Sequence, residues 1–261
     1  MYSHDLIITT FNSDDYIKNI IEVIEKNYNI FTHFFIIDDH SRKSFFLKLN
    51  KEIKTFKKVT LLRNSNNFGV SFARNRGINL SKSKYISFLD PDDYFHPQKA
   101  EIITHFLNSH KPKVLFHNYE IKEKKLHTIF KNYNEESIQI HQNFIYLFKA
   151  IYVTPAFTCE RELLKKINGY NELYRYAEDL DLYIRLRGET PFHFINLKLV
   201  KICSLYSKGF SKKNLSSNQK QMRKNIIIIL KKSLKTTKNK EKLFILLAVL
   251  VNHIKKFFIL F

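Results

Sequence analysis

Short runs of apolar residues alternate with amphipathic stretches through the first 120 residues of the chain. The runs that are typical of strands cover residues 6–8, 34–37, 59–62, 85–89 and 114–116. Apolar positions fall at helical spacing over residues 17–24, 70–80 and 97–108. Strands that are apolar throughout are buried on both faces, and strands that alternate with helices favour parallel pairing. The pattern predicts an α/β fold, doubly wound around a mainly parallel sheet.

The pattern weakens after residue 121, where we expect hairpin and helix pieces as far as residue 158. Helices are expected near residues 160–167 and 178–187, each closed by a glycine, with strand-like segments at 192–206. No internal repeat is apparent. The sequence therefore predicts one α/β domain rather than a repeat protein.

Polar side chains follow three of the predicted strands at their carboxyl ends. Thr9-Thr10-Phe11-Asn12 ends the first, Asp38-Asp39 the second and Asp90-Pro91-Asp92-Asp93 the fourth. Ligands of open α/β sheets bind at the carboxyl ends of the strands. We expect these three segments to meet in one crevice.

The segment that carries Asp90, Asp92 and Asp93 places three carboxylates within four residues. Such carboxylates repel one another unless a cation or solvent offsets their charge. Mg²⁺ and Mn²⁺ take oxygen ligands and can bridge one or two carboxylates to substrate phosphates. A solvated turn with an aspartate that caps a helix is the alternative. The segment alone leaves both open.

Two other segments have a similar ambiguity. Asp38 and Asp39 either cap the next helix or accept hydrogen bonds from a base or ribose. Arg74 follows the loop of Asn67 and Gly69, and its planar fork of donors suits a diphosphate, although helix arginines are often simply solvated.

Glu178 and Asp179 open a predicted helix. Acidic residues in a first turn interact favourably with the helix dipole, and taken alone this explanation suffices. A carboxylate positioned to accept a proton is the alternative.

Six segments resemble, in order, those of glycosyltransferase family 2, the large GT-A group of inverting sugar transferases. They cover residues 9–12, 37–41, 67–77, 88–93, 167–172 and 177–186. Each segment is short, but their shared order makes chance improbable. Asp-His-Ser stands where the family has Asp-Gly-Ser, so His40 occupies a glycine position.

The resemblance implies a role for each matching residue. Thr9 and Asp39 would contact the uridine, and Asp179, with Glu178 beside it, would be the catalytic base. The implied nucleotide-sugar site comprises Thr9, Phe11, Asn12, Asp38, Asp39, Asn67, Gly69, Arg74, Asn75 and Asp90. Mn²⁺ or Mg²⁺ is the implied cofactor, with Asp92, Asp90 and Asp93 as its ligands. Many members carry a further metal-binding histidine, and residues 205–211 have none at that place.

The resemblance also implies an activity. The chain would transfer a hexose or an N-acetylhexosamine from a UDP-sugar donor to a hydroxyl of a glycan or lipid-linked acceptor, with inversion, in lipopolysaccharide or capsule-type biosynthesis. Residues 1–206 would form the GT-A catalytic domain, with a nucleotide-sugar half at 1–121 and an acceptor half at 122–206. A basic amphipathic helical tail would follow at 207–261.

The net charge of +20 is concentrated in that tail, because residues 201–261 carry 15 basic side chains and one acidic. Its apolar runs are short and interrupted, whereas a spanning helix needs about 20 apolar residues. A helix that lies on an anionic membrane surface fits this pattern. The alternative is packing on the catalytic domain or on a second subunit, as in a homodimer.

The start of the chain has no basic-then-apolar leader, so we expect a cytoplasmic protein, peripheral on the inner face of the membrane. One rival reading is a sugar nucleotidyltransferase, but such enzymes generally need a glycine-rich loop after the first strand, which is lacking here. Another is a basic nucleic-acid-binding protein. We expect no nucleic-acid partner because the basic excess is confined to the tail and no binding module is recognisable.

Overall fold

The structure is a computed structural model of the chain, and it describes residues 2–121, 138–141, 152–202, 219–235 and 239–257. Four parallel strands form its first half: β1 (His4–Thr10), β2 (His33–Asp38), β3 (Val59–Arg63) and β4 (Tyr85–Leu89). They lie in the order β3-β2-β1-β4, with β1 at the point where the order reverses. The predicted parallel arrangement is confirmed for this half.

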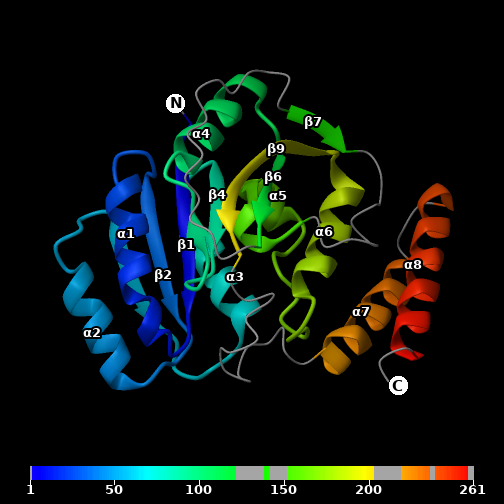
Figure 1. Cartoon of the computed structure of the whole chain (residues 1–261), viewed down its shortest axis with the longest axis horizontal. Coiled ribbons are helices and arrows are strands. Elements are labelled where there is room, and N and C mark those ends of the chain that lie inside the picture. Colours follow the sequence, from blue (N-terminus) through cyan, green and yellow to red (C-terminus); the bar gives the residue numbers. More distant parts are fainter. Residues whose placement is uncertain (1, 122–137, 142–151, 203–218, 236–238, 258–261) are drawn as a thin grey trace.

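Helices cover both faces of these strands (Figure 1). After the short 3-10 turn at Asp14–Tyr16, α1 (Ile17–Asn27) and α2 (Lys43–Ile53) pack on one face. The other face carries α3 (Val70–Leu80), α5 (Arg161–Lys166) and α6 (Glu178–Glu189). The expected α/β layering of a GT-A fold is therefore present.

The sheet continues through strands of mixed direction. Next to β4 lies β8 (Phe157–Glu160), antiparallel to it, and then β6 (Val114–Glu120) and β9 (Phe192–Lys201), which pair in parallel. The short strands β5 (Tyr94–Phe95) and β7 (Ile138–His141) pair with β9 antiparallel. The nine-stranded sheet is thus mixed in its second half, a departure that the periodicity alone did not reveal.

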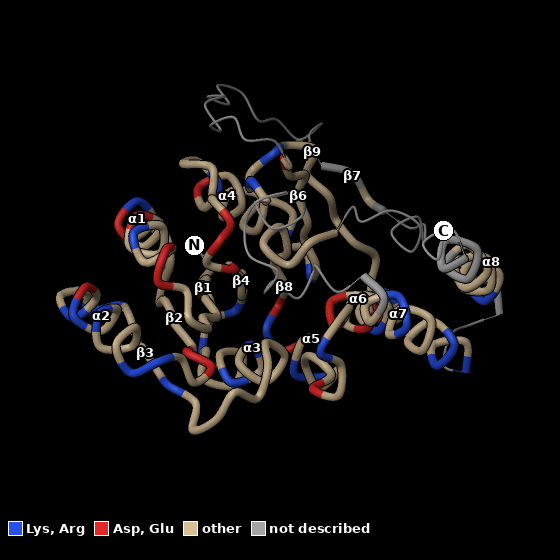
Figure 2. Tube along the Cα trace, turned by 60° about the horizontal axis from the view of Figure 1, so that its bottom comes forward, with Lys and Arg blue, Asp and Glu red and all other residues tan. Residues whose placement is uncertain are grey.

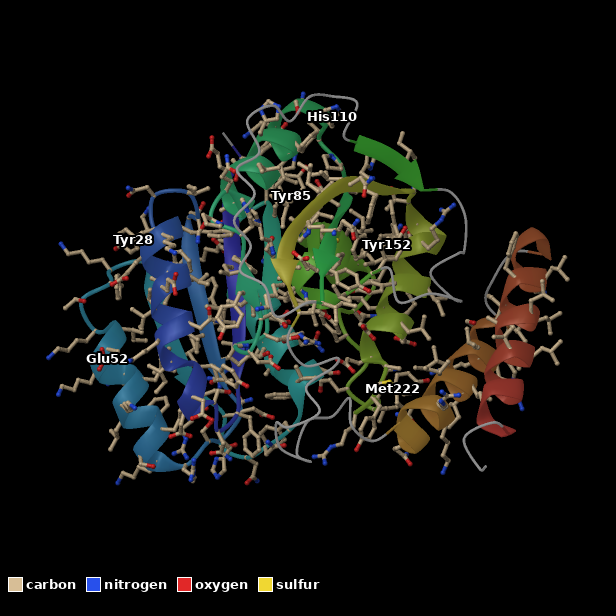
Figure 3. The ribbon with its side chains drawn as sticks, viewed as in Figure 1. Tyr28, Glu52, Tyr85, His110, Tyr152 and Met222 are labelled. Atoms are coloured by element: carbon tan, nitrogen blue, oxygen red, sulfur yellow. The ribbon has the colours of Figure 1, made fainter. Side chains whose placement is uncertain are left out.

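Most predicted boundaries agree with the structure to within two residues. The helix α4 (Lys99–His110) begins two residues after the expected start, and α6 continues through Gly188. Aromatic side chains fill the core beneath the second half: the ring of Tyr152 lies 4.2 Å from that of Phe116 and contacts Tyr183 edge-on (Figure 3). The pieces expected over residues 122–158 and 203–206 fall largely outside the described residues.

A helical hairpin, α7 (Gln219–Ser233) and α8 (Asn239–Phe257), lies at the end of the molecule opposite α2 (Figure 1). Ile229, Leu230, Ile245 and Ala248 join the same core cluster as α6, so the inner face of the hairpin packs on the catalytic domain. The predicted C-terminal helices are confirmed. Among the described residues, no helix combines the length and apolar content that crossing a bilayer requires.

Gly77 allows α3 to approach β1 closely. A Cβ atom at this position would lie 2.7 Å from Cγ2 of Ile7, a fully buried β-branched side chain with little freedom to move. We expect Gly77→Ala to lower the free energy of unfolding by about 1–3 kcal/mol through overpacking, measured by urea denaturation.

Gly188→Ala is the matched control. A Cβ there meets nothing within 4 Å, so the substitution should raise stability by about 0.5–1 kcal/mol, the gain expected for alanine in a helix. Equal effects of the two substitutions would contradict the close approach of α3.

Candidate active site

The three polar segments lie side by side because β2, β1 and β4 are neighbours. Thr10 of β1 is in register with Asp38 of β2, and Ile8 of β1 with Leu89 of β4. The chain therefore leaves the sheet on the same edge at Phe11, at Asp39 and at Asp90. The expected convergence of these strand ends is present.

Asp39 holds the loop that leads into α3. Its buried carboxylate accepts hydrogen bonds from the amides of Phe68 (3.0 Å) and Gly69 (2.7 Å) and from Nδ2 of Asn64 (2.8 Å). Gly69 has a φ of +97°, which glycine adopts without strain. Asn67 adds a bond from Nδ2 to the Asp39 carbonyl at 3.3 Å. Bonds from backbone amides to a carboxylate fix the position at which α3 begins.

Asp38 and Asn12 connect the loops after β1 and β2. The Asp38 carboxylate is fully buried and accepts bonds from the hydroxyl of Thr10 (3.2 Å) and the amide of Ser41 (3.1 Å). Asn12 donates its amide to the Ser41 hydroxyl (2.8 Å) and accepts the amide of Arg42 (2.9 Å). Both side chains thus accept hydrogen bonds from protein groups, and direct contact of either with a nucleotide stays a prediction.

His40 occupies the family's glycine position, and its backbone has a conformation that glycine adopts more readily. Its φ is +67°, in the left-handed region, which is uncommon for a residue with a side chain. The ring nitrogen Nδ1 lies 3.1 Å from the carbonyl oxygen of Asn64. That contact offsets part of the conformational cost and ties the loop after β2 to the residue that follows β3.

Arg74 of α3 is the central charged group of the site. Its guanidinium donates to Oδ1 of Asp90 and to Oε1 of Glu178, both at 2.9 Å, and it lies 5.1 Å from the ring centre of Tyr170. The side chain is only 4% exposed. Burial acts to lower the pKa of Arg74, but the two carboxylates and Tyr170 more than offset it and leave the pKa raised. A permanent cation therefore links the end of β4 to the start of α6.

Asn75, the next residue of α3, binds the loop before α6 through hydrogen bonds. Its Oδ1 accepts the amide of Tyr170, and its Nδ2 donates to the Tyr170 carbonyl and to Glu172, each at 2.8 Å. Gly169 has a φ of +59°, and a Cβ there would lie 2.3 Å from Oδ1 of Asn75. Asn75 therefore contacts protein groups, and its part in nucleotide binding stays a prediction.

The acidic segment after β4 is partly open. The side chain of Asp90 is 29% exposed, and its Oδ1 accepts a hydrogen bond from Arg74. Burial and the charge of Asp90 raise the pKa of Asp92 to about 6. Asp93 is buried, and its charge acts to raise the pKa of Lys99 in α4, which burial lowers. Nδ2 of Asn19 holds the carbonyls of Pro91 and Asp93, each at 2.8 Å. Asp90 and Asp92 are thus the carboxylates with access to a ligand.

Asp179 stands in the first turn of α6, immediately after Glu178. Burial and the charge of Glu178 raise its pKa to about 7, although the amide of Leu180, 2.8 Å from Oδ1, and Arg74 act in the opposite direction. Ala177, the residue before the helix, has a φ of +57°. A strained residue at this place fits a site that must aim the next two side chains.

The remaining predicted residues lie on β1 and its loop: Thr9 is buried near the carboxyl end of the strand, and Phe11 is 51% exposed. Two residues that the sequence reasoning did not single out contribute strongly. Tyr170 lies against Arg74, and Asn64 holds Asp39. Tyr170 belongs to a matched family segment, which could have marked it, but its contact with Arg74 depends on the folded loop.

A divalent ion fits the acidic segment only if the substrate supplies further ligands. Within the described part of the chain, no group of three or more histidine, cysteine, aspartate or glutamate side chains is placed to hold a metal ion. Mg²⁺ usually keeps several waters and uses one or two carboxylates with substrate phosphates. Asp92 and the free oxygen of Asp90 meet that requirement, whereas residues 205–211 lie outside the described residues.

The sequence profile described as "Glycosyl transferase family 2" matches residues 5–167 of this chain. The chain belongs to glycosyltransferase family 2. The match covers β1 to β8, including Asp39, Arg74 and the acidic segment. The protein is therefore a glycosyltransferase.

Relatives of known sequence and structure agree with this assignment. An uncharacterised glycosyltransferase of Methanocaldococcus jannaschii is 25% identical over 75% of this chain and 69% of its own length. The UDP-Glc:alpha-D-GlcNAc-diphosphoundecaprenol beta-1,3-glucosyltransferase WfaP of Escherichia coli is 32% identical over 45% of this chain and 46% of its own. The crystal structure of S. aureus TarS 1-349 with UDP-GlcNAc superposes with a TM-score of 0.75 at 15% identity, over 97% of this chain and 73% of that one. The last likeness confirms the GT-A-like fold.

Removing the buried cation should be costly. Arg74→Met leaves Asp90 and Glu178 without their partner, and breaking a buried ion pair typically costs about 3–5 kcal/mol. We expect a loss of that order in the free energy of unfolding, measured by urea denaturation.

Arg42→Met is the control for that experiment. Arg42 pairs with Asp14 at 2.8 Å, but its side chain is 67% exposed, so the loss should stay below about 1 kcal/mol. Losses of equal size in both variants would show that the Arg74 pair is no stronger than a surface ion pair.

Proposed function

We propose that this glycosyltransferase transfers a hexose or N-acetylhexosamine from a UDP-sugar to a hydroxyl of a lipid-linked or glycan acceptor, with inversion. The observation that carries the proposal is the bridge from Asp90 through Arg74 to Glu178. It brings the acidic segment after β4, suited to a metal and a diphosphate, beside a carboxylate with a raised pKa in Asp179. Donor activation and proton removal then occur in one site.

Names of two similar proteins support the choice of donor and acceptor. The TarS structure holds UDP-GlcNAc, and the name of WfaP gives UDP-glucose as donor and a diphosphoundecaprenol-linked sugar as acceptor. We extend both classes to this chain: a UDP-sugar donor and an acceptor that is built on a lipid carrier. A role in lipopolysaccharide or capsule-type biosynthesis on the cytoplasmic face of the membrane follows from such an acceptor.

The donor side of the proposed mechanism uses the residues after β1, β2 and β4. Mn²⁺ or Mg²⁺, held by Asp92 and Asp90 together with the donor diphosphate, would offset the charge that develops on the leaving UDP. Asp39 and Asn67 fix the loop before α3, and Phe11 offers an exposed ring after β1. Asp93 was also predicted as a ligand, but it is buried, so we assign the ion to Asp92 and Asp90.

Asp179 completes the mechanism on the acceptor side. As a carboxylate it takes the proton of the acceptor hydroxyl while that oxygen bonds to the anomeric carbon, and the bond to UDP breaks on the opposite face. Arg74 engages Glu178, which leaves Asp179 as the carboxylate of the pair available for the proton. Residues 1–121 would hold the donor and 122–206 the acceptor, and the helices α7 and α8 would form a basic tail that packs on the catalytic domain through its inner face.

UDP release separates this proposal from its nearest rival. With a panel of UDP-sugars and Mn²⁺, the wild-type chain should release UDP, whereas a sugar nucleotidyltransferase supplied with a sugar phosphate and UTP would release pyrophosphate. Asp92→Asn should abolish metal-dependent release of UDP. Asp179→Asn should retain donor binding and lose transfer by about 10²-fold or more.

Asp15→Asn, a change on the 3-10 turn before α1, is the control and should leave turnover unchanged. Wild-type transfer by Asp179→Asn would remove that residue from the role of base.

The raised pKa of Asp179 sets the expected pH dependence. Because only the carboxylate accepts a proton, the transfer rate should rise through about pH 7 and then level off. The folded state holds the Asp179 proton more tightly than the unfolded chain, so ionisation costs stability as pH rises from about 4 through 7.

Asp179→Asn cannot ionise, and its melting temperature should exceed that of the wild type by a margin that widens from about pH 4 to pH 8. A constant margin would show that the pKa of Asp179 is not raised in the folded protein.

A further inference from the structure

The outer face of α8 carries an apolar stripe that nothing in the described structure covers. Leu243, Leu246, Leu247 and Leu250 recur at the spacing of one helix face, and they are 62%, 52%, 44% and 56% exposed. Ile245 and Ala248 lie on the opposite side and are fully buried in the core cluster shared with α7 and α6. The stripe is therefore surplus to the packing of the hairpin on the catalytic domain.

Basic side chains lie close in the chain to the start of the stripe. Lys231, Lys232 and Lys235, at and just beyond the end of α7, are exposed and lie near the turn that leads into α8. Lys242 precedes Leu243 by one residue. Blue segments mark the described parts of α7 and α8, and red marks the start of the neighbouring α6 (Figure 2). Cationic groups near exposed leucines suit a surface in which an anionic layer covers an apolar one.

We propose that this face, the α8 stripe with the lysines of the α7–α8 turn, docks in the interface of an anionic lipid bilayer. The helix would lie in the membrane plane with Leu243, Leu246, Leu247 and Leu250 among the acyl chains and the lysines at the phosphate level. This docking rests on the proposed function, because an enzyme held at the membrane meets a lipid-linked acceptor at the membrane surface.

Charge favours lipid over a second copy of the chain as the occupant. Residues 201–261 carry 15 basic side chains and one acidic, so two such faces brought together would repel. The remaining 200 residues carry a small positive excess as well, and offer no net negative charge to attract the tail. An anionic bilayer supplies both the charge and the apolar layer that the face requires.

Vesicle binding of the full chain tests the proposal. We expect the protein to sediment with vesicles that contain about one third phosphatidylglycerol and to bind pure phosphatidylcholine vesicles at least about tenfold more weakly. Salt at about 0.5 M should weaken the binding to anionic vesicles, because it screens the lysines. Equal binding to both kinds of vesicle, or no binding to either, would overturn the proposal.

Leu246→Glu/Leu250→Glu should weaken binding to anionic vesicles by at least about tenfold, because both changes put a charge where acyl chains would lie. Leu47→Glu is the matched control: Leu47 is 54% exposed, as Leu250 is at 56%, but it lies on α2 at the opposite end of the molecule (Figure 1). It should bind as the wild type does. Equal losses in both variants, or none in the double variant, would remove the stripe from the proposal.

Donor hydrolysis in detergent-free solution keeps this test separate from that of the proposed function. The double variant should release UDP from a UDP-sugar at the wild-type rate, which also shows that it is folded. Leu246→Ser/Leu250→Ser serves if the glutamates prevent folding. A wild-type dimer that the double variant converts to monomer, without any vesicle binding, would instead assign the stripe to a second copy.

Discussion

The guanidinium of Arg74, buried between Asp90 and Glu178, is the interaction on which the arrangement of this site depends. The two carboxylates come from segments 88 residues apart, and neither would tolerate the other's charge nearby without the cation. A buried ion pair is weak evidence for stability but specifies geometry well, because both carboxylates must meet one planar fork. The link fixes the start of α6, and Asp179 with it, relative to the acidic segment after β4.

The helix α3 carries that cation because its own position is fixed at several points. Asp39 binds the amides at its start, Gly77 allows its later turns to approach β1, and Asn75 reaches the loop that precedes α6. Three of the non-glycine residues with positive φ lie in loops that carry predicted site residues, at Asn12, His40 and Ala177. Strained backbone persists where surrounding contacts determine it, and such places are frequent at functional sites.

The sequence predicted the strands of the first half, the helices and the segments of the site, because each depends on local periodicity or a short motif. It did not predict the antiparallel β8 between β4 and β6, whose few residues carry no distinctive period. Nor did it distinguish the tasks within the site. Asp38, Asp39 and Asn75 bind protein groups, and the contact of Arg74 with Tyr170 depends on a loop held from a distance. Tertiary contacts decide these roles, and no local pattern encodes them.

The most direct test of the central claim is the anomalous scattering of Mn²⁺ in crystals of the chain grown with UDP. We expect one peak about 2 Å from a carboxylate oxygen of Asp92 and from the diphosphate, with the Arg74 bridge to Asp90 and Glu178 intact. A peak remote from the acidic segment, or UDP bound away from the carboxyl ends of β1, β2 and β4, would contradict it.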